Sequence, residues 1–162
     1  MKIPKRSILI TLSRVFPKNH PRKGEPTNFA RKLADGTLKH TIRGNYYMWV
    51  LNAEKLRHPE RWQLSVRQWS GQPYRSKQEE IAIINHPIAV EPLLMHYHAD
   101  TDTITAKVET KPVDIADIAT NNGLTLDEFK DWYFAPYRRK QDFLYCGSII
   151  QFTDFRYNVA SK

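Results

Sequence analysis

The sequence predicts a single α+β domain spanning residues 1–162, built as a small barrel of mixed strands with short helices between them. A length of 162 residues suits one sizeable hydrophobic core but not two. Several short segments alternate polar and apolar residues, as half-buried strands do. Helical segments with recognisable caps separate these strands, and this order favours a mixed architecture.

Strands and helices alternate in the first half of the chain. Residues 16–26 contain three prolines and a glycine, so they form a loop, and this loop is strongly basic. Either Thr27 or Asn28 caps the helix that follows, and Gly36 ends it. The predicted strands are residues 7–13, 38–43, 62–70 and 79–85, and the predicted helices are residues 29–35 and 45–60.

The second half is predicted to hold a strand pair, two helices and a last strand. Pro112 lies near the beginning of the first helix, and Gly123 lies just past its end. Thr125 and Glu128 form a capping box that starts the second helix. That helix has an apolar face made of Leu126, Phe129, Trp132 and Tyr133. The segments are strands at residues 89–99, 103–109 and 148–157, and a first helix at residues 111–123.

Composition predicts a globular, cytoplasmic protein. The hydrophobic fraction is 41% and the aromatic fraction 12%, which are values of folded and not of disordered chains. No segment approaches the roughly 18 apolar residues that cross a bilayer. Polar residues interrupt the apolar run near the N-terminus, and no small-residue cleavage site follows it. The single cysteine, Cys146, forms no internal disulfide, and its neighbours predict a buried structural thiol.

Positive charge is concentrated in the first quarter of the chain. Residues 1–43 carry eleven Lys and Arg against two Asp and Glu, a balance of +9, and the remaining residues have a balance of −1. The net charge of +8 therefore comes entirely from the first segment. Clustered positive charge of this kind is typical of proteins that bind nucleic acids or phosphates, although basic proteins without such partners are common.

Two histidines raise the possibility of a metal site. His96 and His98 are two residues apart on a predicted strand, so both imidazoles face the same way. Asp100 and Asp102 follow at the same spacing. A further ligand would have to come from elsewhere in the chain, and none of the other histidines suggests itself. We therefore predict scattered histidines on a polar strand face, no metal and no cofactor.

Motifs for nucleophilic catalysis are missing from the sequence. It contains no G-x-S-x-G element, no recognisable Cys–His pairing and no glycine loop for phosphate. Adjacent carboxylates occur at Glu79 and Glu80 and again at Asp127 and Glu128, but neighbouring side chains point apart on a strand or a helix. The second pair lies in the first turn of a helix, where the dipole favours negative charge.

Basic and aromatic residues form the remaining candidate site. Aromatic faces stack on exposed bases while Arg and Lys hold the backbone, which is how single-stranded RNA is usually bound. Ordinary packing in the core or in a turn would explain each aromatic residue taken alone. The whole cluster, together with the basic first quarter of the chain, favours RNA or a nucleotide as the ligand. The candidate residues are Lys39, Thr41, Arg43, Tyr46, Arg67, Trp69, Tyr74, Arg75 and Lys77.

The segment NFARKLADGTLKHTIRGN resembles the signature of the ASCH domains, a branch of the PUA-like superfamily. The matching features are a short helix, Gly36, a basic residue at Lys39 and a T-I-R strand ending at Arg43. The segments LSVRQWSGQPYRSKQEEIA, NNGLTLDEFKDWY and IIQFTDFRY are similar to a subgroup from bacteroidete genomes, their phages and mobile elements. The resemblance covers residues 8–157 and implies a PUA-like β-pseudo-barrel with helices around a cleft that binds RNA or nucleotides.

The same resemblance implies a hydrolase as the alternative, either an amidohydrolase on acylated cytidine-type nucleosides or a ribonuclease. Its catalytic residues would be Lys39, Thr41 and Glu80. The amidohydrolases keep their lysine two residues after the glycine, where this chain has Leu38, and a one-residue shift on a strand turns a side chain to the opposite face. Binding is therefore favoured over catalysis. A third possibility is a phage or mobile-element protein that acts by contact with another protein.

Overall fold

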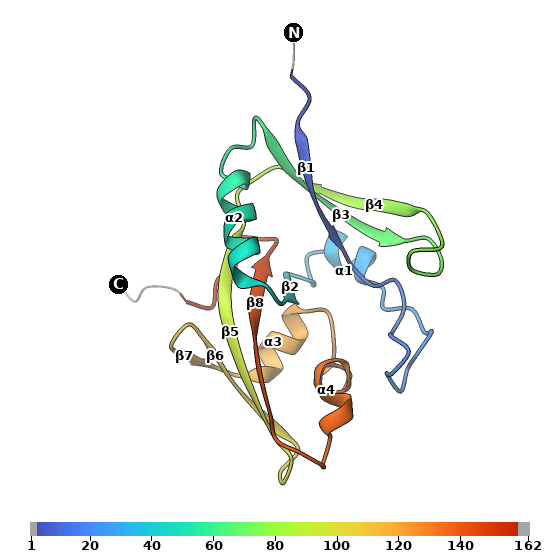
Figure 1. Ribbon diagram of the computed structural model, residues 1–162, viewed down its shortest axis with the longest axis vertical. Coiled ribbons are helices and arrows are strands. Elements are labelled where there is room, and N and C mark those ends of the chain that lie inside the picture. The colour runs from blue at the N-terminus through green and yellow to red at the C-terminus, as the bar shows by residue number, and fades with distance from the viewer. Residues whose placement is uncertain (1–2, 159–162) are drawn as a thin grey trace.

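Within residues 3–158, the part of the chain that the computed structural model describes, short helices accompany two β-sheets (Figure 1). The first sheet has three strands in the order β1-β3-β4, and the second has five in the order β2-β8-β5-β6-β7. The strands are β1 (Arg6–Thr11), β2 (His40–Arg43), β3 (Trp62–Trp69), β4 (Gln78–Ile84), β5 (Ala89–His98), β6 (Thr103–Val108), β7 (Lys111–Val113) and β8 (Phe143–Gln151). The helices are α1 (Phe29–Ala34), α2 (Tyr46–Leu56), α3 (Ile115–Asn121), α4 (Leu126–Phe134) and the short 3-10 helix η1 (Ala135–Tyr137).

The five-stranded sheet is antiparallel, and the three-stranded sheet is mixed. β1 runs parallel to β3, whereas β4 is antiparallel to β3 and every neighbouring pair in the five-stranded sheet is antiparallel. The α+β class predicted from the sequence is confirmed. The two sheets are separate, and the strands of the described residues do not close into a barrel.

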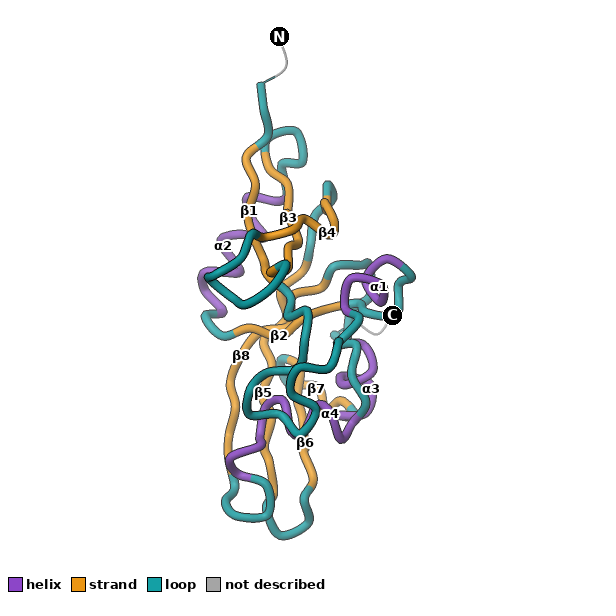
Figure 2. Tube along the Cα trace, turned by 90° about the vertical axis from the view of Figure 1, so that its right-hand side faces the viewer, coloured by secondary structure: helices purple, strands orange, loops and turns teal. Residues whose placement is uncertain are grey.

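The helices flank the long strands on two sides. α2 lies on one side of β5 and β8, and α3 and α4 lie on the other (Figures 1 and 2). The three-stranded sheet occupies one end of an elongated molecule, and the turn between β5 and β6 lies at the other end. Among the described residues, no helix has the length and apolar character needed to pass through a bilayer.

A continuous hydrophobic core connects the two sheets. Leu93, Met95 and Tyr97 alternate along β5 and bury their side chains on one face of the sheet. Phe129 and Phe134 of α4 pack against that face, and the Phe134 ring stacks on Tyr97 at 5.4 Å. Burial of each such side chain contributes roughly 1.5–3 kcal/mol. Buried residues of β1 and β3 belong to the same cluster, so the end of β1 is held against the second sheet.

Helix ends agree well with the sequence analysis. Gly36 and Gly123 follow α1 and α3 with φ of +83° and +80°, the left-handed conformation that a glycine adopts without strain. Thr125 and Glu128 form the capping box of α4. Apart from the two segments described next, the predicted strands and helices are present, with ends shifted by no more than four residues.

The predicted helix over residues 111–123 begins too early. Residues Lys111–Val113 form the edge strand β7, which pairs with β6, and an edge strand tolerates the missing N–H of Pro112. The helix starts only at Ile115, because Asp114 is its N-cap and accepts a hydrogen bond from Ala116 N–H at 2.9 Å.

The sequence analysis also misplaced the last strand, which it predicted over residues 148–157. β8 spans Phe143–Gln151 and pairs with both β2 and β5. It ends before Thr153, whose hydroxyl accepts a hydrogen bond from Phe155 N–H and closes a turn. Cys146 lies opposite Leu94 on the outer face of the sheet and is exposed, so the prediction of a buried thiol is wrong.

Candidate nucleic-acid site

A small polar pocket opens beside β2, where the end of β1, α1 and the α3–α4 segment meet. Its volume is about 90 Å³. Its apolar wall includes Phe29, Leu38 and Trp132. No Asp, Glu or Lys is among the described residues that line it. The polar lining residues are Ser13, His40, Thr41, Arg43, Asn122 and Tyr133.

β2 places Thr41 and Arg43 in this pocket. The strand is an edge strand that pairs only with β8 in the described structure, with Thr41 opposite Ile150 and Arg43 opposite Ser148. Thr41 is only 8% exposed. The polar face of β2 is therefore turned into an enclosed pocket.

His40 of β2 also lines the pocket, and its side chain is fully buried. Its Nδ1 donates to Asn122 Oδ1 at 3.2 Å, and its Nε2 accepts from the Tyr157 hydroxyl at 2.6 Å. Burial lowers the pKa of His40 from 6.5 to about 3, because a charged imidazolium would lose its hydration there. His40 is therefore neutral at physiological pH and serves to fix Asn122.

Arg43 brings a positive charge into the pocket, and no described residue there supplies a counter-charge. Its Nη2 donates to the Thr11 carbonyl at 2.5 Å, which ties β2 to the end of β1. Its Nε is buried and has no hydrogen-bond partner among residues 3–158. Desolvation lowers the pKa of this guanidinium, yet none of the salt bridges in the described structure includes it. An anion in the pocket would supply the missing partner.

Two hydroxyl groups add further donors beside Arg43. The Tyr133 hydroxyl accepts from Asn122 Nδ2 at 3.4 Å, so its own proton is left to donate. Burial raises the pKa of Tyr133, so this proton is retained. No hydrogen bond between described residues uses the Thr41 hydroxyl. A guanidinium and two hydroxyls suit phosphate or carbonyl oxygens, because all three donate hydrogen bonds.

An aromatic groove of about 400 Å³ adjoins the pocket, because Trp132 and Tyr133 line both. Tyr137, Phe143 and Tyr145 line the rest of its aromatic surface. Rings that border a groove offer stacking surfaces for bases. The sequence analysis assigned Trp132 and Tyr133 only to the apolar face of a helix. No sequence signal separates their part in the groove from their part in the core, against which both residues also pack.

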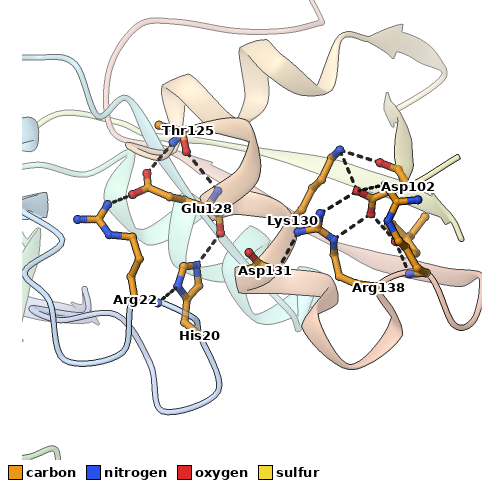
Figure 3. A network of polar contacts seen from close by, with 10 residues as sticks. His20, Arg22, Asp102, Thr125, Glu128, Lys130, Asp131 and Arg138 are labelled. Atoms are coloured by element: carbon orange, nitrogen blue, oxygen red, sulfur yellow. Dashed lines mark hydrogen bonds and ion pairs between the residues drawn. The ribbon is translucent and has the colours of Figure 1, made fainter.

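The basic loop at residues 16–26 forms one rim of this groove and is fixed against α4 (Figure 3). His20 Nε2 donates to the Glu128 carbonyl, and His20 Nδ1 accepts from Arg22 N–H, both at 3.0 Å. The Arg22 guanidinium pairs with the Glu128 carboxylate. Lys18 and Lys23 are exposed on the same loop and take part in no salt bridge of the described residues.

A buried carboxylate holds the far end of α4 (Figure 3). Asp102, in the turn between β5 and β6, accepts two hydrogen bonds from Arg138 at 2.9 and 2.7 Å and one from the Tyr97 hydroxyl at 2.6 Å. Arg138 also donates to Asp131 of α4 at 2.8 Å. These partners lower the pKa of Asp102 from 3.8 to about 2. The network thereby positions the helix that carries Trp132 and Tyr133.

The other predicted binding residues lie away from this pocket. Lys39 does not line it, and its ammonium lies 4.7 Å from the centre of the Phe155 ring. Tyr46 lines a separate cavity of about 360 Å³ beside α2. The hairpin of β3 and β4 carries the five remaining candidate residues. The rings of Trp69 and Tyr74 lie 5.1 Å apart there. These five residues are Arg67, Trp69, Tyr74, Arg75 and Lys77.

Among residues 3–158, no hydrogen bond or salt bridge joins any two of the three residues of the hydrolase alternative. Thr41 lines the pocket, and Lys39 packs on Phe155. Glu80 lies on β4 opposite Arg67 and accepts a hydrogen bond from Ser65 Oγ at 2.6 Å.

Comparison with known proteins returned no relative. No family model matches the chain, and no match was found among curated proteins or solved structures.

Proposed function

We propose that this protein binds single-stranded RNA or a nucleotide and places an anionic group against Arg43. The observation that carries the proposal is the desolvated guanidinium, whose Nε lacks a partner among the described residues. A buried charge without a counter-charge is costly, so a ligand that supplies one gains affinity. The pocket of about 90 Å³ admits a phosphate or part of a base, and the aromatic groove beside it has room for the rest of a nucleotide.

The fold proposed for this function is a PUA-like β-pseudo-barrel of the ASCH type. The segment that resembles the ASCH signature forms α1, the turn at Gly36 and β2. This same segment lines the polar pocket through Phe29, Thr41 and Arg43. The motif and the candidate site therefore coincide, which supports the resemblance.

Binding is proposed in preference to hydrolysis because of what lines the pocket. Leu38, and not Lys39, faces it together with Thr41. No carboxylate is present among its described lining residues, and both ring nitrogens of His40 are bonded to Asn122 and Tyr157, so the Thr41 hydroxyl has no free base there to remove its proton. Turnover of acylated cytidine is accordingly expected to be absent.

Fluorescence anisotropy with a labelled single-stranded RNA at low salt tests the proposal. Arg43→Met removes the charge and keeps a side chain of similar length. We expect its affinity to fall roughly ten- to a hundredfold, because a hydrogen bond to a charged group contributes about 1.5–3 kcal/mol. Affinity of the unchanged protein should also fall as salt rises.

Arg57→Met is the matched control, because Arg57 is exposed at the end of α2 and pairs only with Glu54 in the described structure. It removes the same charge from a surface away from the pocket and should leave the affinity nearly unchanged. Equal losses in the two variants would reduce the binding to general attraction by positive charge. Absence of binding to RNA, DNA and nucleotides at micromolar protein would overturn the proposal.

A further inference from the structure

The outer face of the five-stranded sheet carries a cluster of three metal-ligating side chains. His96 and His98 occupy alternate positions near the end of β5, and their rings lie 4.1 Å apart. Asp142 immediately precedes β8. One ligand atom from each of the three residues lies within 4.8 Å of the other two.

Strand register explains how a residue distant in sequence joins the two histidines. β5 and β8 are antiparallel, with His96 opposite Leu144 and Tyr97 opposite Phe143. One step further along the same register places Asp142 beside His98. The carboxylates that follow the histidines in sequence do not take this position. Asp102 instead turns inward to Arg138.

Hydrogen bonds hold two of the three groups in place. The His98 ring is bonded through Nε2 to the Thr105 hydroxyl at 3.1 Å, which leaves its Nδ1 for another partner. Asp142 Oδ1 accepts from Ala99 N–H at 2.7 Å, which leaves Oδ2. Ligands of bound metals are commonly oriented by such secondary hydrogen bonds.

We propose that His96, His98 and Asp142 bind a divalent transition-metal ion of the zinc type. Two imidazoles and one carboxylate are the ligands such ions prefer, whereas Mg²⁺ and Ca²⁺ prefer oxygen alone. Zinc lies about 2.0–2.2 Å from such ligands, so two ligand atoms of a tetrahedral site stand roughly 3.3–3.6 Å apart. The ligand atoms of the three residues lie within 4.8 Å of one another, so small side-chain rotations bring them to this spacing.

The site differs from the RNA pocket in position and in chemistry. None of its three residues lines the pocket or the aromatic groove. Three protein ligands leave at least one coordination position for water or another exchangeable ligand. The site revises the sequence-based expectation of no metal, which depended on the missing third ligand.

Isothermal titration of the chelator-treated protein with Zn²⁺ tests this inference. We expect about one equivalent to bind, and both His98→Ala and Asp142→Asn to weaken binding by at least tenfold. All proteins in the comparison carry Cys146→Ser, because the exposed thiol on the same sheet face is a separate zinc ligand. Circular dichroism verifies that each variant is folded.

His86→Ala is the matched control, because His86 is exposed and its ring bonds only to the neighbouring Pro87 carbonyl within the described residues. It should bind Zn²⁺ as tightly as the parent protein. No binding by the parent protein would overturn the inference. So would binding that survives in both His98→Ala and Asp142→Asn, or that His86→Ala weakens equally.

Discussion

Asp102 and Arg43 are both charged groups withdrawn from water, and their surroundings differ. The Asp102 side chain is 7% exposed and is met by Arg138, Lys130 and the Tyr97 hydroxyl. Arg43 has one backbone carbonyl as partner and no carboxylate in the described structure. Among residues 3–158, the Asp102 charge is matched by cations, whereas the Arg43 charge has no carboxylate as partner.

The surroundings of Asp102 and the pocket around Arg43 also differ in the protonation state that they favour for their titratable groups. The cations around Asp102 lower its pKa and keep it ionised. Beside Arg43, burial lowers the pKa of His40 and keeps it neutral. A matched buried charge has no need of a ligand, and the fold depends on both partners because removal of one strands the other. An unmatched donor group such as Arg43 gains a partner only when an anion arrives, so we assign stability to the first network and binding to the second.

Breaking the Asp102 network should have the largest effect on the free energy of unfolding. Arg138→Met leaves the buried Asp102 carboxylate with Lys130 at 3.7 Å as its nearest remaining cation. We expect a loss of about 3 kcal/mol in the free energy of unfolding, since removal of one partner of a buried ion pair strands the other. Urea-induced unfolding followed by tryptophan fluorescence measures this loss.

Arg57→Met serves again as the control, since exposed ion pairs contribute about 0–1 kcal/mol. A loss in Arg138→Met no larger than that of Arg57→Met would show that the Asp102 network does not hold α4. The distinction between the two regions would then fail.

As the pH falls, protonation linked to His40 in the pocket should lower the free energy of unfolding before protonation of Asp102 does. The pKa of His40 is about 3 in the folded protein and 6.5 when unfolded, so the unfolded chain binds the proton first. The stabilisation from neutral His40 is complete above pH 6.5 and is lost progressively as pH falls toward 3. At about 1.4 kcal/mol per pH unit, the loss between pH 7 and pH 5 is about 2 kcal/mol. Asp102 stays ionised throughout this interval.

His40→Asn removes the titrating group and keeps an amide that can hydrogen-bond to Asn122 and Tyr157. The free energy of unfolding of this variant, measured by urea unfolding at pH 7, 6 and 5, should fall less steeply than that of the parent. Parallel curves for the two proteins would mean that His40 does not lose its proton on folding.

Features of the fold that depend on neighbours in sequence were predictable, and features that depend on register were not. The capping box of Thr125 and Glu128 and the turn at Gly36 are local, and both are present. The beginning of β8 at Phe143 and the exposure of Cys146 follow from pairing with β5, some fifty residues earlier. No short segment contains that information.

The same distinction applies to the candidate site. Lys39, Thr41 and Arg43 were predicted as binding residues of one short segment, and Thr41 and Arg43 line the pocket whereas Lys39 does not. Asn122, Trp132 and Tyr133 reach it because α3 and α4 pack against the second sheet, an arrangement that the sequence does not reveal. Asp142 joins the two histidines through strand register alone.

Replacement of Arg43, the charge without a carboxylate partner in the described structure, should have the smallest effect on stability. Arg43→Met removes a desolvated guanidinium and one hydrogen bond to the Thr11 carbonyl, so gain and loss nearly cancel. The free energy of unfolding should change by no more than about 1 kcal/mol, against about 3 kcal/mol for Arg138→Met. RNA at ten times its dissociation constant should stabilise the parent protein by about 1.4 kcal/mol and Arg43→Met much less. A loss in Arg43→Met as large as that in Arg138→Met would make Arg43 a structural residue, and the pocket would then need another group to attract its anion.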